Sequence, residues 1–299
     1  MEKIKKIDVH AHVTAYPDLI PHFPRTGERF LSCQELLEFY DRLNIEKGVL
    51  LPLVAAEGQF AQLSNENSII ASRMHPDRFV WFCNVDPRAA SNNENADLRY
   101  ILEHYKALGA RGMGELTAQL YADDPKIDNL FSACEECDFP VTIHISPRMG
   151  YWYGIVDELG LPRLESMLQK HPKLKVIGHS QPFWAEMSAG LTEEQREDYP
   201  TGKVIKGRVW ELMSKYENLY CDLSADSGMS AMMRDPDNAA EFMHTFADRV
   251  LYGCDLCGYN YDGFIAFDQF LDNLVESGKL SEADYRKIVR ENAIKILKL

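Results

Sequence analysis

The chain has 299 residues, a formal net charge of −14 and 45% hydrophobic residues, a composition typical of a soluble globular enzyme. No basic cluster is longer than Lys5-Lys6, which argues against a nucleic-acid surface because such surfaces need clustered positive charge. No apolar run has the length of a signal peptide or a membrane span, so we expect a cytoplasmic protein whose seven cysteines are free thiols.

Short apolar runs alternate with segments of helical periodicity, a pattern typical of parallel strands covered by helices. The predicted strands, in chain order, are Ile4–Val9, Gly48–Leu53, Phe79–Asn84, Arg111–Glu115, Pro140–Ile145, Leu174–His179, Leu219–Leu223 and Val250–Cys254. Helical stripes cover Gln34–Leu43 and Leu161–His171, and capping patterns predict helix starts at Thr192 and Ser281.

Long loops follow several predicted strands, whereas the loops that precede strands are short. Val13–Cys33 follows the first strand and Ser180–Gly202 follows the sixth, but Asn44–Lys47 is a short helix-to-strand connection. In a (β/α)₈ barrel the loops after the strands build the catalytic face. We therefore predict a (β/α)₈ TIM barrel that forms one domain over residues 1–299.

Side chains that can bind a metal stand at the carboxyl ends of the predicted strands. They are His10, His12, Glu115, His144, His179 and Asp255. His10 and His12 are two residues apart, so both imidazoles can face one side of a strand and share a cation. Barrel interiors are apolar, so polar residues at this end indicate a site. Imidazoles with a carboxylate favour a divalent metal, with Zn²⁺ as the first expectation.

The long loops supply candidate substrate contacts. The residues chosen are Arg148, Trp152 and Trp184. Arg148 is preferred because it follows His144 by four residues and an arginine is suited to clamp a substrate carboxylate. Cys254 and Cys257 bracket Asp255, and we interpret them as ordinary thiols, although Cys257 could lie near the metal.

The motifs at these strand ends also have a family likeness. The segments that carry it are Ile7-Asp8-Val9-His10-Ala11-His12, His75-Pro76-Asp77-Arg78-Phe79, Thr142-Ile143-His144, Ile177-Gly178-His179, Leu251-Tyr252-Gly253-Cys254-Asp255 and Glu291-Asn292-Ala293-Ile294-Lys295-Ile296-Leu297. With them the chain resembles the amidohydrolase superfamily, and more narrowly the amidohydrolase-related branch that includes aminocarboxymuconate-semialdehyde decarboxylase-type enzymes.

This resemblance implies a metal site and roles for its residues. Its metal ligands would be His10, His12, His144 and Asp255, because the matching residues of that family bind one metal. His179 would lie beside the metal water as a base or as electrostatic support. Glu115, at the end of the fourth predicted strand, has open alternatives: a carboxylate bridging two metals, a substrate contact, or a salt-bridge partner of Arg111.

The resemblance leaves two reactions open. In hydrolysis, the first interpretation, a metal-activated water attacks a small, carboxylated lactone, amide or ester, and His179 or Asp255 takes the proton. In nonoxidative decarboxylation, the alternative, the metal and an arginine hold the substrate while carbon is protonated. Hydrolysis is favoured because Glu115 and the sequence Asp255-Leu256-Cys257-Gly258 depart from the decarboxylase pattern.

A third interpretation is a metal-binding barrel without catalysis, which the intact set of ligands disfavours. One bound metal is expected, with two as the alternative. The expected partner is a small-molecule substrate of unspecified identity, and assembly into a homo-oligomer is left open.

Overall fold

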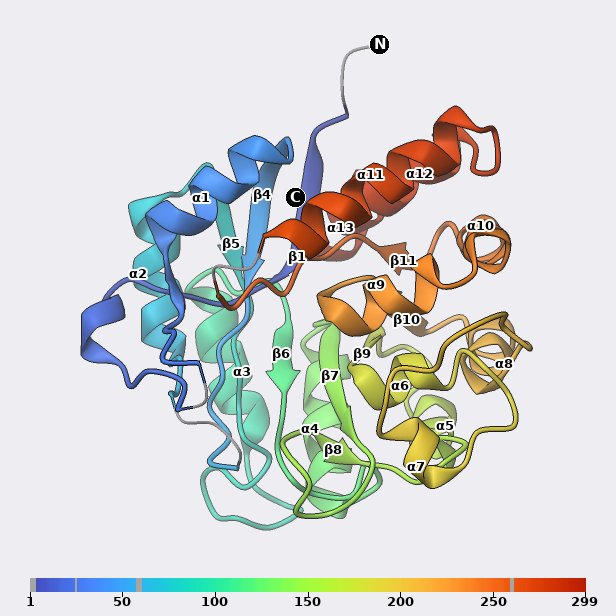
Figure 1. The fold of residues 1–299 in the computed structure, drawn as a ribbon. Helices are drawn as coiled ribbons and strands as arrows, with labels where there is room; N and C mark the ends of the chain where they lie inside the picture. The colour runs from blue at the N-terminus through green and yellow to red at the C-terminus, as the bar shows by residue number, and fades with distance from the viewer. Residues whose placement is uncertain (1–3, 25, 58–60, 259–260) are drawn as a thin grey trace.

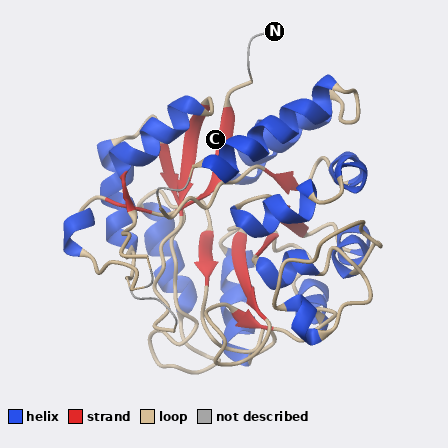
Figure 2. Ribbon diagram, in the orientation of Figure 1, coloured by secondary structure: helices blue, strands red, loops and turns tan. Residues whose placement is uncertain are grey.

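A ring of parallel strands surrounded by helices forms the centre of the molecule (Figures 1 and 2). The computed structural model describes residues 4–24, 26–57, 61–258 and 261–299. The barrel strands are β1 (Lys6–Ala11), β4 (Ile45–Leu50), β5 (Phe79–Trp81), β6 (Met113–Leu116), β7 (Val141–Ser146), β9 (Val176–His179), β10 (Leu219–Asp222) and β11 (Val250–Leu251). Each of the predicted strands overlaps one of them.

The strands pair in a closed cycle. One sheet has the order β1-β4-β5 and a second follows the path β11-β10-β9-β7-β6, with the short strand β8 (Ile155–Val156) paired to β7. Parallel bridges from Cys83 to Met113 and from Ala11 to Leu256 join the two sheets at both edges. The resulting cycle, in chain order, confirms the predicted (β/α)₈ barrel.

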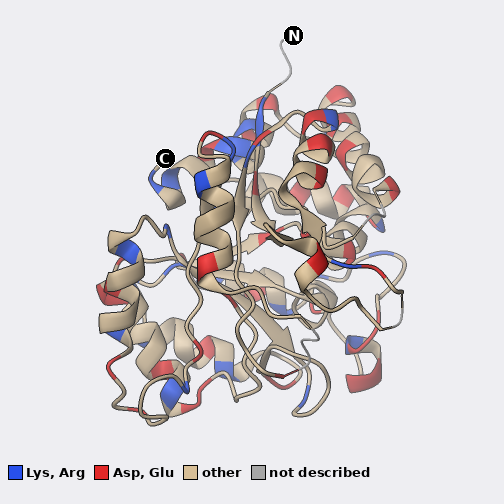
Figure 3. Cartoon of the chain, turned by 90° about the vertical axis from the view of Figure 1, so that its left-hand side faces the viewer, with Lys and Arg blue, Asp and Glu red and all other residues tan. Residues whose placement is uncertain are grey.

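Helices follow most of the strands and cover the outside of the barrel. They are α1 (Cys33–Arg42), α2 (Asn65–Met74), α3 (Leu98–Ala107), α4 (Pro125–Glu136), α5 (Pro162–Lys170), α8 (Arg208–Lys215), α9 (Ala225–Met233), α10 (Pro236–Thr245) and α11 (Asp262–Glu276). Helices α1 and α5 confirm the two predicted helical stripes. None of the helices in the described parts of the chain is long and apolar enough to cross a membrane, and Figure 3 shows both signs of charge interspersed over the helices in view.

The two longest predicted loops carry short elements of their own. The first contains β2 (Val13–Thr14), the 3₁₀ turn η1 (Pro17–Leu19) and β3 (Leu31–Ser32), and β2 pairs with β3. The second contains α6 (Gln181–Ala185) and α7 (Glu193–Arg196). Helix α7 begins with the predicted capping box at Thr192.

The C-terminal segment closes the barrel where the strands begin. It consists of α12 (Glu282–Arg286), the π-helical turn η2 (Lys287–Glu291) and α13 (Asn292–Leu297), and Ser281 caps α12 as predicted. Ala293 and Ile296 of α13 pack in one buried cluster with Ile7 and Val9 of β1. The opposite end, where the strands finish, is left for the site.

A β-bulge in β1 places the two histidines of the H-x-H motif. Ile7 and Val9 point into the barrel, whereas Asp8 points outward to Tyr40 of α1. In a regular strand His10 would face outward with Asp8, because side chains alternate. Asp8 pairs with Gly48 but Ala11 with Leu50, so β1 contains one extra residue. Such a bulge re-aims the side chains that follow it, and His10 faces inward.

The carboxylate of Asp8 fixes this bulge and the seam of the barrel. One of its oxygens accepts the backbone N–H groups of His10 and Cys254, each at 2.9 Å, and the other accepts the Tyr40 hydroxyl at 2.7 Å. Burial raises the pKa of Asp8 to about 6. Gly48 leaves room for the Tyr40 ring, because a Cβ there would collide with the hydroxyl.

Replacing Tyr40 should show how much this seam contributes to stability. Tyr40→Phe removes a buried hydrogen bond to a carboxyl group and should lower the free energy of unfolding by about 1.5–3 kcal/mol, measured by urea denaturation. Tyr100→Phe, on an exposed tyrosine of α3, is the matched control and should change it by less than about 0.5 kcal/mol. Equal stability of both variants would contradict the role given to Asp8 and Tyr40.

Candidate metal centre

The imidazoles of His10 and His12 turn the same nitrogen toward one point. His10 Nδ1 donates to Asp222 Oδ2 at 3.0 Å and His12 Nδ1 donates to the Leu51 carbonyl at 2.8 Å. Since a carbonyl and an ionised carboxylate only accept, both Nδ1 atoms carry hydrogen and both Nε2 atoms present lone pairs. The two Nε2 atoms lie 3.2 Å apart. Two lone pairs at this distance repel each other unless a proton or a cation lies between them.

Two carboxylates complete this first group. Glu115 Oε2 of β6 lies 3.3 Å from His12 Nε2 and 3.5 Å from His10 Nε2. Asp255 Oδ1, after β11, lies 3.3 Å from His12 Nε2 and 3.7 Å from His10 Nε2. Ligands about 2.1 Å from a tetrahedral ion are roughly 3.4 Å apart, so the distances from the two histidines to each other and to each carboxylate are those expected around a divalent cation.

A second group shares Glu115 with the first. The ligand atoms of Glu115, His144 and His179 lie within 4.8 Å of one another. Glu115 Oε1 and His144 Nδ1 are both buried and have no hydrogen-bond partner among the described residues. Orphaned buried polar atoms indicate a missing partner such as an ion. The donor set therefore fits a cation here as well.

The structure divides the predicted metal ligands between two groups. The structure brings His10, His12 and Asp255 together as expected, but Glu115 lies against the two histidines where His144 was predicted. His144 stands beside His179, with their ring centroids 5.6 Å apart, and under Tyr153 at 4.6 Å. Burial lowers the pKa of His144 to about 4, so its imidazole is neutral.

Asp222 at the end of β10 supports two of these histidines and was not predicted. Its fully buried carboxylate accepts from His10 Nδ1 at 3.0 Å and from His179 Nδ1 at 2.9 Å. Although burial alone would raise it, the neighbouring His179 and His10 hold the pKa of Asp222 well below its usual range. Asp222 lies in the predicted strand Leu219–Leu223, so the strand-end criterion, applied to that strand too, would have found it.

The same carboxylate controls His179. Burial disfavours the charged imidazole, but Asp222 raises the pKa of His179 to about 9. The Nε2 atom of His179 faces the site and lies 3.5 Å from Asp255 Oδ2. Asp255 itself has a left-handed φ of +53°, an uncommon conformation for a residue other than glycine that occurs at functional sites.

The predicted substrate contacts differ in their exposure. Arg148 is exposed and its Nε donates to Glu197 at 2.8 Å. Trp184 is only 1% exposed, and its indole N–H donates to the Asp222 carbonyl at 3.1 Å. It therefore supports the site from within the core and cannot reach a substrate. Trp152 is exposed, at 39%.

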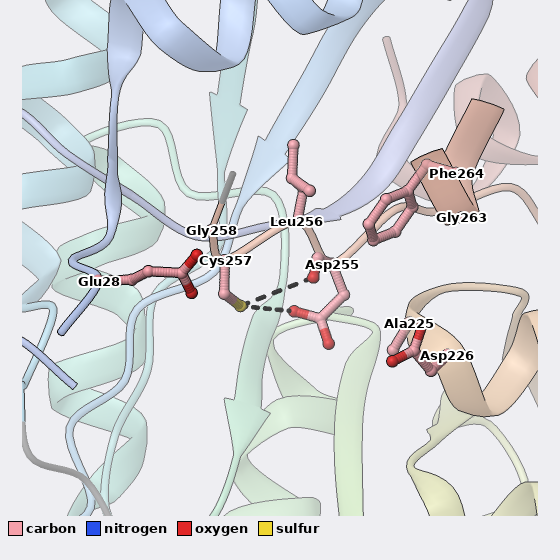
Figure 4. Close-up of a pocket in the computed structure, with 9 residues that line it drawn as sticks. All are labelled: Glu28, Ala225, Asp226, Asp255, Leu256, Cys257, Gly258, Gly263 and Phe264. Carbon is pink, nitrogen blue, oxygen red and sulfur yellow. Dashed lines mark hydrogen bonds between the residues drawn. The ribbon is translucent and has the colours of Figure 1, made fainter. Parts of the chain in front are cut away.

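A pocket of about 210 Å³ opens beside Asp255 (Figure 4). Its acidic lining residues include Glu28 and Asp226, and Cys257 and Phe264 also face it. No Lys or Arg is found among the described residues that line it. The pocket is therefore acidic, whereas a site that binds a substrate carboxylate through an arginine would be basic.

The amidohydrolase family profile matches residues 7–299. The chain belongs to the amidohydrolase family. This confirms the resemblance drawn from the strand-end motifs. A comparison of this amidohydrolase-family chain with curated proteins gives no match.

Solved structures agree on the fold of this amidohydrolase. It is similar to a probable 2-pyrone-4,6-dicarboxylic acid hydrolase from Acinetobacter baumannii with a TM-score of 0.62 and 14% identity, over 99% of this chain and 100% of that one. It is also similar to 2,6-dihydroxybenzoate decarboxylase from Rhizobium, with a TM-score of 0.60 and 19% identity over 99% of both chains. A third similar structure is dihydroxybenzoic acid decarboxylase from Polaromonas with bound manganese. Its TM-score is 0.58 and its sequence identity 18%, over 99% of this chain and 98% of that one.

At these identities the likeness shows the fold alone. Two of these three structures are decarboxylases and one is a probable hydrolase, and the bound manganese of one of them leaves the expectation of zinc unconfirmed.

The link between His179 and Asp222 predicts a pH dependence of stability in the metal-free protein. The folded pKa of His179, about 9, exceeds its ordinary value of 6.5, so this stabilisation is complete below pH 6.5 and is lost as the pH rises through 9. The expected loss is about 3 kcal/mol of unfolding free energy. In His179→Gln this part of the pH dependence should vanish. His104→Gln, which changes an exposed histidine of α3, is the control and should retain it. Identical urea-denaturation profiles for His179→Gln and wild type would refute the link.

Proposed function

We propose that this chain is a metal-dependent hydrolase of a small lactone, amide or ester. The observation that carries the proposal is the position of Glu115, whose carboxylate lies between the His10–His12 pair and the His144–His179 pair. Divalent cations bound here would act as Lewis acids toward a substrate carbonyl and make water reactive at neutral pH. They would be held by His10, His12, Glu115, His144 and Asp255, and His179 Nε2 would stay without a metal so that it can exchange a proton. A carboxylate shared by two such groups is suited to a pair of cations.

The proton of the reaction is handled by His179 and Asp255. Asp222 fixes hydrogen on His179 Nδ1, so proton exchange is confined to Nε2, which faces the site. Asp255 Oδ2 lies 3.5 Å from this Nε2. One group can remove the proton of the attacking water and the other can deliver it to the leaving group.

The pocket bears on the substrate's charge. Arg148, the residue expected to clamp a carboxylate, is engaged by Glu197 at the surface, and Glu28 and Asp226 line the pocket beside Asp255. Like charges across a site are unfavourable. We therefore revise the expectation of a carboxylated substrate and propose that the part of the substrate entering this pocket is neutral or cationic.

Nonoxidative decarboxylation is the second candidate, favoured by the decarboxylases among the similar solved structures. In that reaction His179 would protonate the substrate carbon, the bond to the carboxylate carbon would break, and CO₂ would leave. The same residues can serve it, but it places an anionic substrate beside an acidic pocket.

Metal stoichiometry tests the shared role of Glu115. Wild-type protein should bind about two equivalents of a divalent metal by elemental analysis, and His144→Ala and Glu115→Gln should each bind fewer, because each removes a ligand. His171→Ala, a buried histidine that contacts Asp128, is the control and should keep both equivalents. One equivalent in the wild type and in His144→Ala would remove the basis for preferring hydrolysis.

The reaction itself is tested by turnover on panels of lactones, amides and aromatic acids. Hydrolysis should be found among the neutral or cationic compounds. His179→Asn should lower kcat by roughly 10²–10⁴-fold, and this variant should bind at least as much metal as Glu115→Gln. Release of CO₂ from an aromatic acid, with no hydrolysis in either panel, would decide for the decarboxylase instead.

A further inference from the structure

Cys257 stands at the edge of the metal centre, where its thiol meets a proposed ligand. Its Sγ lies 3.3 Å from Asp255 Oδ1 and 3.6 Å from the Asp255 carbonyl, and Figure 4 shows the side chain turned toward that carboxylate. The ligand atoms of His12, Asp255 and Cys257 all lie within 4.8 Å of one another. The Cys257 thiol is therefore as close to His12 and Asp255 as the ligands of one metal ion are to one another.

The geometry around Asp255 Oδ1 relates this thiol to the first metal group. The same oxygen lies 3.3 Å from His12 Nε2 and 3.3 Å from Cys257 Sγ. A separate observation shows that this centre lacks a bound partner. Glu115 Oε2 lies 3.3 Å from His12 Nε2, and its other oxygen, Oε1, is buried and has no hydrogen-bond partner within the described chain. Donor atoms from different strand ends therefore converge on one region.

We propose that Cys257 is a thiolate ligand of this centre and that it makes the centre favour zinc over manganese. The inference rests on the proposed metal-dependent function. On binding, the S–H bond breaks, the proton leaves through the adjacent pocket to solvent, and a sulfur–metal bond forms without a change of oxidation state. Thiolates prefer borderline metals such as Zn²⁺, whereas carboxylates and water suit Mn²⁺.

This preference would distinguish the chain from the Polaromonas decarboxylase of the same fold, whose structure contains manganese. A carboxylate and imidazole set alone could accept either ion. The added sulfur ligand shifts the balance, because the two metals differ more in affinity for thiolate than for oxygen.

Spectroscopy of the loaded protein tests the ligand directly. Wild-type protein with Co²⁺ should show a thiolate-to-cobalt charge-transfer band in the near ultraviolet, and X-ray absorption of the zinc form should show a sulfur shell at about 2.3 Å. Both signals should be lost in Cys257→Ser. Cys254→Ser is the matched control, since Cys254 flanks Asp255 on the other side and its thiol hydrogen-bonds to Tyr252, and it should retain both signals.

Metal competition gives the second readout. Cys257→Ser should lower the affinity for Zn²⁺ relative to Mn²⁺ by roughly 10- to 100-fold, while Cys254→Ser leaves the ratio unchanged. If metal binds fully but no sulfur signal is seen, or the signal persists in Cys257→Ser, the thiolate assignment is overturned while the metal centre stands. If no metal binds to the wild type, the proposed function fails with it.

Discussion

The site depends on one buried carboxylate that two imidazoles share. Asp222 is fully buried, and an isolated ionised carboxylate would be costly there because it is removed from water. His10 and His179 each donate an Nδ1 hydrogen to it, which joins β1 and β9 through β10. The same bonds leave both Nε2 atoms facing the mouth of the barrel. A single interaction thus sets the orientation of two functional side chains and stabilises the strands that carry them.

The barrel seam provides the other constraint. The Asp8 carboxylate binds the backbone on both sides of the seam, at His10 and Cys254, and the Asp255 N–H donates to the His10 carbonyl at 2.8 Å. The bulge of β1 and the left-handed turn at Asp255 are held by these bonds. These bonds place the first and last strands so that His12 Nε2 and Asp255 Oδ1, from opposite ends of the sequence, lie 3.3 Å apart.

Sequence reasoning found the barrel because the length and periodicity of apolar runs are local properties. It also found six of the seven polar residues at the strand ends discussed above, and missed Asp222 only because the criterion was not applied to the seventh strand. It could not place Arg148 or Trp184, since their directions depend on Glu197 in the inserted loop and on packing against β10. Nor did it show that Glu115 lies against His10 and His12, because that contact depends on the bulge in β1 that turns His10 inward.

Charge counting connects the thiolate and the shared glutamate. Glu115, Asp255 and a Cys257 thiolate together carry three negative charges, so a single divalent cation would leave the centre with a net negative charge. Such a centre would polarise a carbonyl weakly, because the ligands already satisfy the ion. Two cations would leave a net positive charge on these three ligands, beside a pocket whose lining, at Glu28 and Asp226, is acidic. The positive centre would then attract a carbonyl oxygen or water, while the rim disfavours whole anions. A thiolate ligand is therefore most compatible with a two-cation centre, which agrees with the hydrolysis of uncharged or cationic substrates that we propose.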